Sequence, residues 1–359
     1  MNKNKYKIAV IGAGNGGQAI AGHLSLMGHT IRLYARDISK LARIVERGGI
    51  QLTGEVNGFG LVKTITSNLK EAIQDADVIM VCTTADAHKD IAYKLSNLIN
   101  EKQIIVLNPG RTCGAMEFRR ILDQNNTSSD VKIVEVQSLI YACRLEMPGS
   151  VRIIGFKDNV YYSTFPKKDL DGVDSVMQNI YTSFKKVDNV LITSFENFGA
   201  LFHSVIVLFN VSKIERGEDF YFYNDITPHV CRLLEKVDRE RILLGQKYGV
   251  KVKSAEEWIS FAYTGISGTD FFSKMKNNPA YFKIMAPKSL HTRLLLEDIP
   301  TGILPMIELG KIVGLELPLM NSIYHLASNL LDIDFRKEGR TLENLGLENI
   351  SVEKLLKLL

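Results

Sequence analysis

The sequence is poor in the residues that mark secreted, disulfide-rich and metal-binding proteins. Its 359 residues contain 4 cysteines, at Cys82, Cys113, Cys143 and Cys231, with no CxxC and no Cys/His spacing among them. Such isolated cysteines argue against a disulfide framework and give no support to a metal site. We therefore expect no bound metal and four buried thiols in a reducing cytoplasm.

Long apolar runs and blocks of like charge are also missing. No run reaches the length that crosses a membrane, and the N-terminal MNKNKYK leads straight into a predicted strand, without the apolar core of a signal peptide. The 44 basic and 40 acidic residues are spread along the chain and give a net charge of +4. These absences predict a cytoplasmic protein whose main partner is neither nucleic acid nor a membrane.

A glycine-rich motif near the N-terminus is the strongest signal that is present. The residues from Lys7 to Leu24 read KIAVIGAGNGGQAIAGHL, an apolar run that predicts a buried strand, followed by a predicted helix. Glycines in the spacing GxGxxG permit a tight turn, the approach of backbone to a pyrophosphate, and close packing of helix on strand. A second predicted strand, His29–Tyr34, follows at the distance of a βαβ unit, so the motif predicts a dinucleotide site. The cofactor contacts predicted from this loop are Gly12, Gly14, Asn15, Gly16 and Gly17.

The end of the second predicted strand favours NADP and leaves NAD open. The strand ends Tyr34-Ala35-Arg36-Asp37. An NAD site usually offers a carboxylate to the ribose 2′-hydroxyl, and Ala35 cannot accept that bond, whereas Arg36 can pair with a 2′-phosphate. Asp37 keeps NAD possible, and Arg36 can also be read as a solvated surface residue.

Two further positions are predicted to face the cofactor from the ends of strands. Thr83 follows the apolar run Val78–Cys82, and Asn108 follows Ile104–Leu107 in an Asn-Pro-Gly turn that is equally a generic turn. The remaining strands predicted in this half are Ile50–Thr53, Gly60–Thr66, Lys132–Val136, Val151–Phe156, Val160–Phe165 and Val190–Ile192, and its remaining helices are Ile38–Arg47, Asn68–Gln74 and Leu170–Phe184.

The second half of the chain has the periodicity of helices and few β-forming runs. We therefore place a domain boundary near residue 190 and predict a Rossmann-type α/β domain with a mostly parallel sheet over 1–190, followed by an all-α domain over 191–359. The predicted helices of that domain are Asn197–Ile214, Thr227–Tyr248, Ala255–Tyr263, Asp270–Met275, Leu304–Val313 and Leu319–Leu331.

Candidates for proton transfer and substrate binding stand in this helical half. A dehydrogenase needs a proton donor, and histidine suits that role, but His203 lies in the apolar stretch ALFHSVIVLF, where a core histidine is the simpler interpretation. In LHTRLLLEDIPTG, Arg293 and Glu297 are four positions apart and could pair with each other. Asp298 then falls off their common face and could reach another element.

Several segments resemble one known family. On them, and along nearly the whole chain, the protein resembles the opine dehydrogenases, also called the octopine/nopaline dehydrogenase family. The segments are IGAGNGGQAIAGHL, LNPGRTCGAMEFRRIL, SLIYACRLEMPGSV, ITPHVCRLLEKVDRERI, NNPAYFKIMAP, TRLLLEDIPTGILPMIELG and DIDFRKEGRTLENLGL.

The resemblance implies an activity and residue roles. It implies a helical domain that closes over a Rossmann-type domain, and the reductive condensation of a 2-oxo acid such as pyruvate with the amino group of an L-amino acid, using NAD(P)H. It also implies that His203 is the catalytic histidine, that Asp298 is its partner, and that Arg293 holds the carboxylate of the oxo acid. Arg144 is a candidate for a further carboxylate contact, with a surface ion pair as the alternative.

The chain departs from the family at two positions. Several relatives have an asparagine four residues before the histidine, where this chain has Gly199, and an NAD-dependent relative has an aspartate where this chain has Ala35. The family therefore does not decide the cofactor, and small-molecule substrates and a homodimer are expectations taken from it. The alternatives are a dehydrogenase of the same architecture that reduces a 2-oxo acid or secondary alcohol without an amine, and a nucleotide-sensing protein without activity.

Overall fold

The computed structural model divides into two compact units. It describes residues 4–128 and 130–359, apart from the side chain of Lys40. The first unit comprises Met1–Gly110 and Gly114–Val190, and the second comprises Leu191–Leu359 together with the short segment Arg111–Cys113. A tripeptide from the middle of the first half of the sequence is thus part of the helical unit.

The first unit is built on an eight-stranded sheet in the order β12-β11-β8-β7-β6-β1-β2-β5. All neighbouring strands are parallel except β8 and β11, which are antiparallel. The central strands β6 and β7 are fully buried, which explains their unbroken apolar sequences. The strands are β1 Lys7–Ile11, β2 Thr30–Tyr34, β5 Thr64–Thr66, β6 Val78–Val81, β7 Ile104–Leu107, β8 Lys132–Val136, β11 Val160–Thr164 and β12 Phe184–Lys186.

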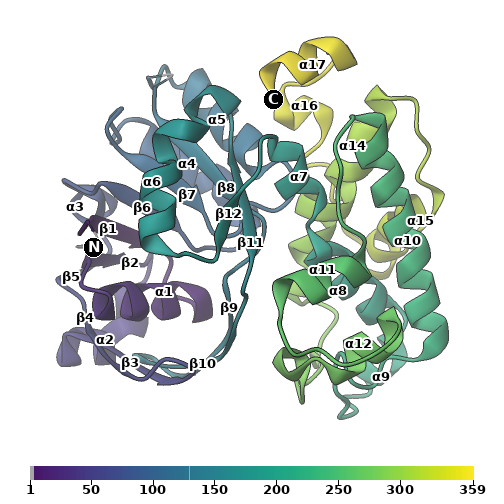
Figure 1. Ribbon diagram of the computed structural model, residues 1–359, viewed down its shortest axis with the longest axis horizontal. Helices are drawn as coiled ribbons and strands as arrows, with labels where there is room; N and C mark the ends of the chain where they lie inside the picture. Colours follow the sequence, from purple (N-terminus) through teal and green to yellow (C-terminus); the bar gives the residue numbers. More distant parts are fainter. Residues whose placement is uncertain (1–3, 129) are drawn as a thin grey trace. The chain divides into compact units, whose positions relative to one another are not determined.

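A second, four-stranded sheet has the order β4-β3-β10-β9. Its strands are β3 Gly49–Gly54, β4 Gly58–Leu61, β9 Tyr141–Met147 and β10 Ser150–Phe156. Helix α1, Asn15–Leu26, lies between β2 of the large sheet and β3 of the small one (Figure 1). A Cβ atom at Gly60 would lie 2.3 Å from the carbonyl oxygen of Gly22, so both glycines are needed where α1 meets β4.

Helices cover the faces of the large sheet, except α2, which contacts β3 of the small sheet. They are α2 Ala42–Arg47, α3 Leu69–Ile73, α4 His88–Ser96, α5 Gly114–Gln124 and α6 Leu170–Ile180, with 3₁₀ turns η1 Ile38–Leu41, η2 Ala85–Ala87 and η3 Lys167–Asp169. Their buried residues, such as Ile91 and Leu95 of α4 or Phe118 and Leu122 of α5, recur at helical spacing and pack on the sheet.

Several predicted elements of this half were wrong in detail. The predicted strand Val190–Ile192 is the start of helix α7, Val190–Phe195. The predicted strand Gly60–Thr66 is divided between β4 and β5, which belong to different sheets, and the predicted helix Leu170–Phe184 ends at Ile180 before β12. Strand β9 was not predicted, and β10 pairs in the small sheet, whereas β11 pairs antiparallel with β8 in the large sheet.

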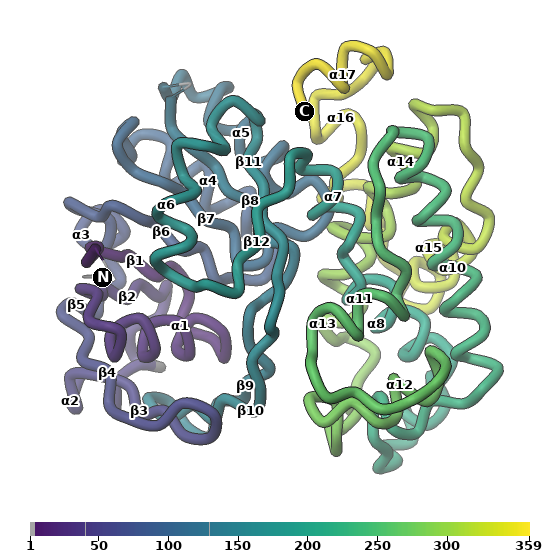
Figure 2. Tube along the Cα trace, in the orientation of Figure 1, coloured from purple at the N-terminus to yellow at the C-terminus, as the bar shows by residue number. Residues whose placement is uncertain are grey.

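The long elements of the second unit are helices. Figure 2 shows two of them, α10 and α15, side by side. The predicted helix Asn197–Ile214 is broken at Phe209–Asn210 into α8 and α9. The elements are α8 Phe198–Leu208, α9 Val211–Glu215, α10 Pro228–Lys247, α11 Ala255–Ala262, α12 Phe271–Asn277, η4 Pro279–Tyr281, α13 Arg293–Leu296, the π-helix η5 Ile299–Ile303, α14 Leu304–Ile312, α15 Pro318–Leu331, α16 Leu342–Leu345 and α17 Val352–Leu358.

One apolar stretch is longer than the sequence suggested. Val190–Leu208 has the length and composition to cross a membrane, but 83% of it is buried inside the protein, as in the core helix of a globular unit. The expectation of four buried thiols is also only half right: Cys113 and Cys231 are buried, whereas Cys82 and Cys143 are half-buried, and none of the four is in a disulfide.

Candidate functional site

The glycine motif of the first unit forms the turn between β1 and α1. Gly12 has φ +105°, and a Cβ atom there would lie 3.0 Å from the carbonyl oxygen of Cys82. A Cβ at Gly17 would lie 1.9 Å from the carbonyl oxygen of Gly12, so the helix can start so close to the strand only with glycine. A Cβ at Gly14 would meet no atom within 4 Å. Protein atoms thus fill the space beside Gly12 and Gly17, whereas the space beside Gly14 is open, as a phosphate-binding turn requires.

Asn15 and Gly16 tie this turn to the segment around β9. The Asn15 side-chain oxygen accepts a 3.1 Å hydrogen bond from the backbone N–H of Leu145. A Cβ at Gly16 would lie 3.0 Å from the side chain of Leu139. Both residues therefore have structural reasons for their identity, besides the predicted contact with a cofactor.

β2 is followed by an exposed arginine, Arg36, and by Asp37, whose carboxylate already accepts hydrogen bonds. Arg36 is exposed, and Asp37 caps the turn η1 by accepting 3.0 Å from the backbone N–H and 2.5 Å from the hydroxyl of Ser39. Asp37 therefore stabilises local structure with one of its two carboxylate oxygens.

Three buried polar atoms lie after the carboxyl ends of neighbouring strands. The hydroxyl oxygens of Thr83 and Ser138 and the amide oxygen of Asn108 are buried without a hydrogen-bond partner, and they follow β6, β8 and β7 respectively. Unpaired buried polar atoms are costly, and ligands of open α/β sheets bind at this edge. Together with the open face of Gly14, these atoms fit a bound dinucleotide.

A histidine and an aspartate meet in the second unit. His203, on α8, has its Nδ1 atom 2.6 Å from Oδ2 of Asp298, which precedes η5. Asp298 is fully buried, whereas the His203 side chain is 13% exposed. Helix α8 and η5 can approach because a Cβ at Gly302 would lie 2.3 Å from the Cβ of Ala200, so only glycine fits. The predicted pair is therefore a contact between elements 95 positions apart.

A buried arginine faces the other oxygen of Asp298. Arg111 lies 3.5 Å from Oδ1 of Asp298 and 3.2 Å from Oε1 of Glu297. It also donates to the side-chain oxygen of Asn197, 3.2 Å away. Burial alone would raise the pKa of Asp298, but the charges of Arg111 and His203 lower it below the usual value. Asp298 is therefore held as a carboxylate beside the imidazole.

Gly199 leaves the space that Arg111 fills. A Cβ atom at position 199 would lie 2.7 Å from Nη1 of Arg111. A side chain at position 199 would therefore have to displace the guanidinium of Arg111. Asn197, two residues earlier, uses its amide to bind Arg111 and the hydroxyl of Thr112 at 3.3 Å.

Arg293 stands at the exposed edge of this group. Its guanidinium contacts Oε2 of Glu297 at 3.3 Å, which is the pairing expected at four-residue spacing, and its side chain remains 57% exposed. Glu297 thus joins Arg293 to Arg111. Arg144, in contrast, belongs to β9 of the first unit and is exposed.

The other nitrogen of His203 contacts a tyrosine. Nε2 lies 3.0 Å from the hydroxyl of Tyr223, and the ring of Phe222 meets the imidazole edge-on with 5.9 Å between centroids. Tyr223 stacks on Tyr281 at 4.2 Å. Among the residues that the structure describes, no group of three or more histidine, cysteine or carboxylate side chains is arranged to hold a metal.

Comparison with known proteins decides the family. The family of NAD/NADP octopine/nopaline dehydrogenases matches residues 186–331 by its α-helical domain, and the family of coenzyme F420-dependent NADP oxidoreductases matches residues 7–109. The opine dehydrogenase of Arthrobacter sp. (strain 1C) is 38% identical over 345 residues, which are 96% of each chain. The chain belongs to the opine dehydrogenase family.

Solved structures of this family agree with the fold. Octopine dehydrogenase with NADH and L-arginine has a TM-score of 0.80 at 18% identity, and yersinopine dehydrogenase with NADP⁺ has a TM-score of 0.69 at 13% identity. The first covers 98% of both chains, and the second covers 99% of this chain and 97% of its own. These structures confirm the predicted fold class, and the Arthrobacter relative with the family match confirms the predicted family and the class of NAD(P)-dependent oxidoreductase.

Sequence reasoning missed two residues of the site. Arg111 follows directly on the turn Asn108-Pro109-Gly110, and that position after a strand was the available signal. Tyr223 lies in a segment between α9 and α10 that carries no motif, so the sequence contained no comparable sign of its contact with His203.

Proposed function

We propose that this protein condenses a 2-oxo acid such as pyruvate with the amino group of an L-amino acid and reduces the product to an N-(1-carboxyalkyl) amino acid. The observation that supports this most directly is the 2.6 Å contact between His203 and the buried Asp298, within a group that includes Arg111 and Arg293. NAD(P)H supplies the hydride for such a reduction.

In this proposal His203 transfers the protons. Its Nδ1–H donates to Asp298, which fixes the tautomer and leaves Nε2 to exchange protons with the reacting atoms. The carboxylate stabilises the imidazolium that forms when Nε2 takes a proton. Asp298 is itself kept ionised by Arg111, so the pair needs no change in the charge of the carboxylate.

Arg293 is proposed to bind the carboxylate of the oxo acid. A guanidinium binds a carboxylate through two parallel hydrogen bonds, and the partial exposure of Arg293 makes it accessible to a substrate. Glu297 orients it from the side. Arg144 is kept as a proposed additional carboxylate contact, and we assign the substrate and catalytic role to 191–359.

The first domain, 1–190, is proposed to bind the dinucleotide, with NADP preferred. Its contacts are Gly12, Gly14, Asn15, Gly16, Gly17, Arg36, Thr83 and Asn108. Arg36→Gln should weaken NADPH binding about 10- to 100-fold, the loss of one charge-assisted contact, and leave NADH binding nearly unchanged. Titration of both cofactors by fluorescence measures this, and equal loss for both would refute the preference.

A matrix of oxo acids and amino acids, assayed with NADPH and NADH, tests the function. NADPH oxidation with pyruvate should require an added amino acid. Turnover without an amine would favour a simple 2-oxo acid or alcohol dehydrogenase, and cofactor binding without any turnover would favour a nucleotide sensor. We further propose a cytoplasmic homodimer, which light scattering of the purified protein can test.

A further inference from the structure

The hydroxyl of Tyr223 contacts Nε2 of His203, the atom through which the proposed mechanism transfers protons. Because Nδ1–H is donated to Asp298 at 2.6 Å, neutral His203 has its lone pair on Nε2. The Tyr223 hydroxyl is 3.0 Å from Nε2 and therefore donates to it. A proton that enters or leaves the imidazole through Nε2 meets this oxygen first.

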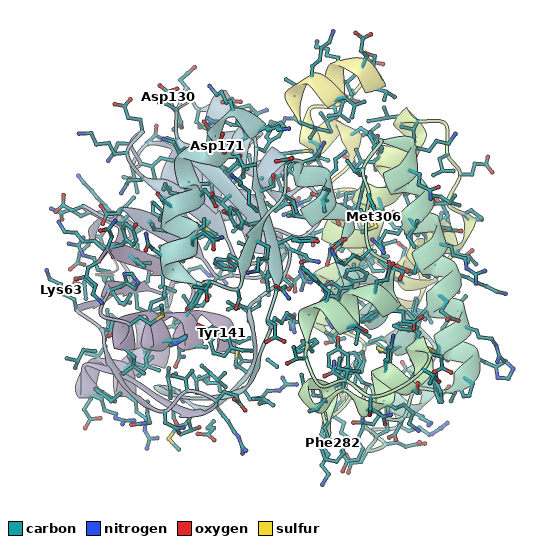
Figure 3. All side chains as sticks on the ribbon, in the orientation of Figure 1. Lys63, Asp130, Tyr141, Asp171, Phe282 and Met306 are labelled. Carbon is teal, nitrogen blue, oxygen red and sulfur yellow. The ribbon has the colours of Figure 1, made fainter. Side chains whose placement is uncertain are left out.

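The backbone around Tyr223 is fixed by another segment of the unit. Phe222 N–H donates 2.7 Å to the carbonyl of Ile284, and Ala286 N–H donates 3.0 Å to the carbonyl of Phe220. Tyr221 and Met285 form a β-bridge between the two segments. Figure 3 labels Phe282, which lies shortly before the second of these segments. The backbone that leads into Tyr223 is thus paired with this second segment.

The charge of Arg111 belongs to the electrostatic surroundings of Tyr223. Burial would lower the pKa of that arginine, but Glu297, Asp298 and Tyr223 together raise it. A nearby guanidinium stabilises negative charge on the Tyr223 oxygen when its proton is transferred.

We propose, on the basis of the function proposed above, that Tyr223 is a further catalytic residue, which relays the proton between Nε2 of His203 and the substrate. In amine addition, the C–N bond forms and the electron pair of the carbonyl π bond moves to oxygen, which takes a proton from solvent and becomes a hydroxyl. The amine nitrogen gives a proton to the Tyr223 oxygen while the Tyr223 proton passes to Nε2. In the dehydration that follows, the C–O bond breaks with its electron pair on oxygen. The Tyr223 proton goes to that oxygen, and Nε2–H replaces it. The proton taken from nitrogen thus leaves in water, and both side chains return to their starting state.

Tyr223→Phe tests the relay, because it keeps the ring stacked on Tyr281 and removes one oxygen. The single-turnover rate of NADPH oxidation should fall about 10- to 1000-fold, within the range of general acid–base catalysis, with affinities for NADPH and the oxo acid changed less than twofold. The control, Tyr281→Phe, removes a hydroxyl from the adjacent ring and should keep the wild-type rate. A Tyr223→Phe rate within twofold of wild type, or equal losses in both variants, would overturn the proposal.

Two further measurements separate catalysis from folding. In a double-mutant cycle, Tyr223→Phe should cost nothing further in a His203→Ala background, since both act on one proton path. In the wild-type enzyme, the single-turnover rate should be measured in mixtures of H₂O and D₂O. A plot of the rate against the fraction of D₂O should be curved, because two protons move together, and a linear plot would contradict the relay. These outcomes concern Tyr223 alone, whereas turnover without an amine would instead refute the proposed function.

Discussion

At the scale of single residues, the charge state of Asp298 decides whether His203 can work as proposed. Asp298 is fully buried, yet it has the guanidinium of Arg111 on one oxygen and the imidazole on the other. A buried carboxylate without such partners would protonate, because burial disfavours the charged form. Arg111 therefore acts on the imidazole through Asp298.

Asp298→Asn should lower the single-turnover rate by about 10²- to 10⁴-fold, because the amide keeps the shape and removes the charge that supports the imidazolium. The affinity for NADPH should stay within twofold of wild type. Stopped-flow oxidation of NADPH measures the rate, and fluorescence titration measures the affinity. A variant with the wild-type rate would exclude Asp298 from the mechanism.

The sequence predicted some residues of the site around His203 and missed others. Asp298 was predicted to point away from the face shared by Arg293 and Glu297, and the resemblance assigned it to His203. The contact of Arg111 with Glu297 spans 186 positions and depends on a tripeptide that belongs to the second unit. No local sequence pattern therefore predicted this contact. Long-range polar contacts are set by packing, which local propensity does not describe.

At the scale of elements, the turn between β1 and α1 carries the cofactor prediction. A Cβ at Gly17 would overlap the carbonyl oxygen of Gly12, whereas a Cβ at Gly14 would enter open space. The two positions of one motif therefore have separate tasks, one in packing the helix on the strand and one in admitting the ligand.

Gly17→Ala should lower the free energy of unfolding, by about 1–3 kcal/mol as for overpacked sites, and weaken cofactor binding as well. Gly14→Ala should leave the unfolding free energy within about 0.5–1 kcal/mol of wild type and still weaken cofactor binding. Urea denaturation and NADPH titration of both variants test this contrast. Equal destabilisation by both would show that the turn is not open at Gly14.

Helix α1 also brings a histidine into an aromatic cluster. The Nδ1 atom of His23 lies 2.9 Å from the hydroxyl of Tyr141, and the rings of Phe156 and Tyr181 pack on the imidazole. Tyr141, labelled in Figure 3, lies beside α1. Burial lowers the pKa of His23 to about 4 from 6.5, so the folded protein favours the neutral ring.

This histidine predicts a loss of stability in mild acid. Between pH 6.5 and about 4 the unfolded chain binds a proton at His23 that the folded chain does not, so stability rises with pH across this window and falls as the solution is acidified. His23→Gln should flatten this part of the curve of unfolding free energy against pH. Parallel curves for wild type and variant would contradict the assignment.

The sequence predicted best the strands whose side chains are buried and mainly apolar. Strands β1, β2, β6, β7 and β8 were placed within a residue or two, because their apolar runs have no helical period. The short apolar segment at Val190 was predicted as a strand and is helix α7, since a run of that length fits either structure and tertiary packing decides. The small sheet was not predicted because it depends on the pairing of β3 with β10, which are far apart in the chain.

At the scale of the whole molecule, two units with different architectures share the proposed reaction. One has the open turn and the unpaired polar atoms that fit a dinucleotide, and the other has the pair of His203 and Asp298 with its two arginines. The change from β-forming to helical sequence near residue 190 was predicted from the helical periodicity of the second half and its few β-forming runs. The tripeptide Arg111–Cys113 could not be predicted, because it belongs by sequence to one half and by packing to the other.

The central claim is that one enzyme joins an oxo acid to an amine through a new C–N bond. Incubation of the protein with NADPH, [2-¹³C]pyruvate and a ¹⁵N-labelled L-amino acid tests it directly by NMR of the product. The account predicts a saturated ¹³C atom with one-bond coupling to ¹⁵N, formed by the wild type and lost in His203→Ala. Labelled lactate as the only reduced product, or coupled product at the wild-type rate from His203→Ala, would contradict it.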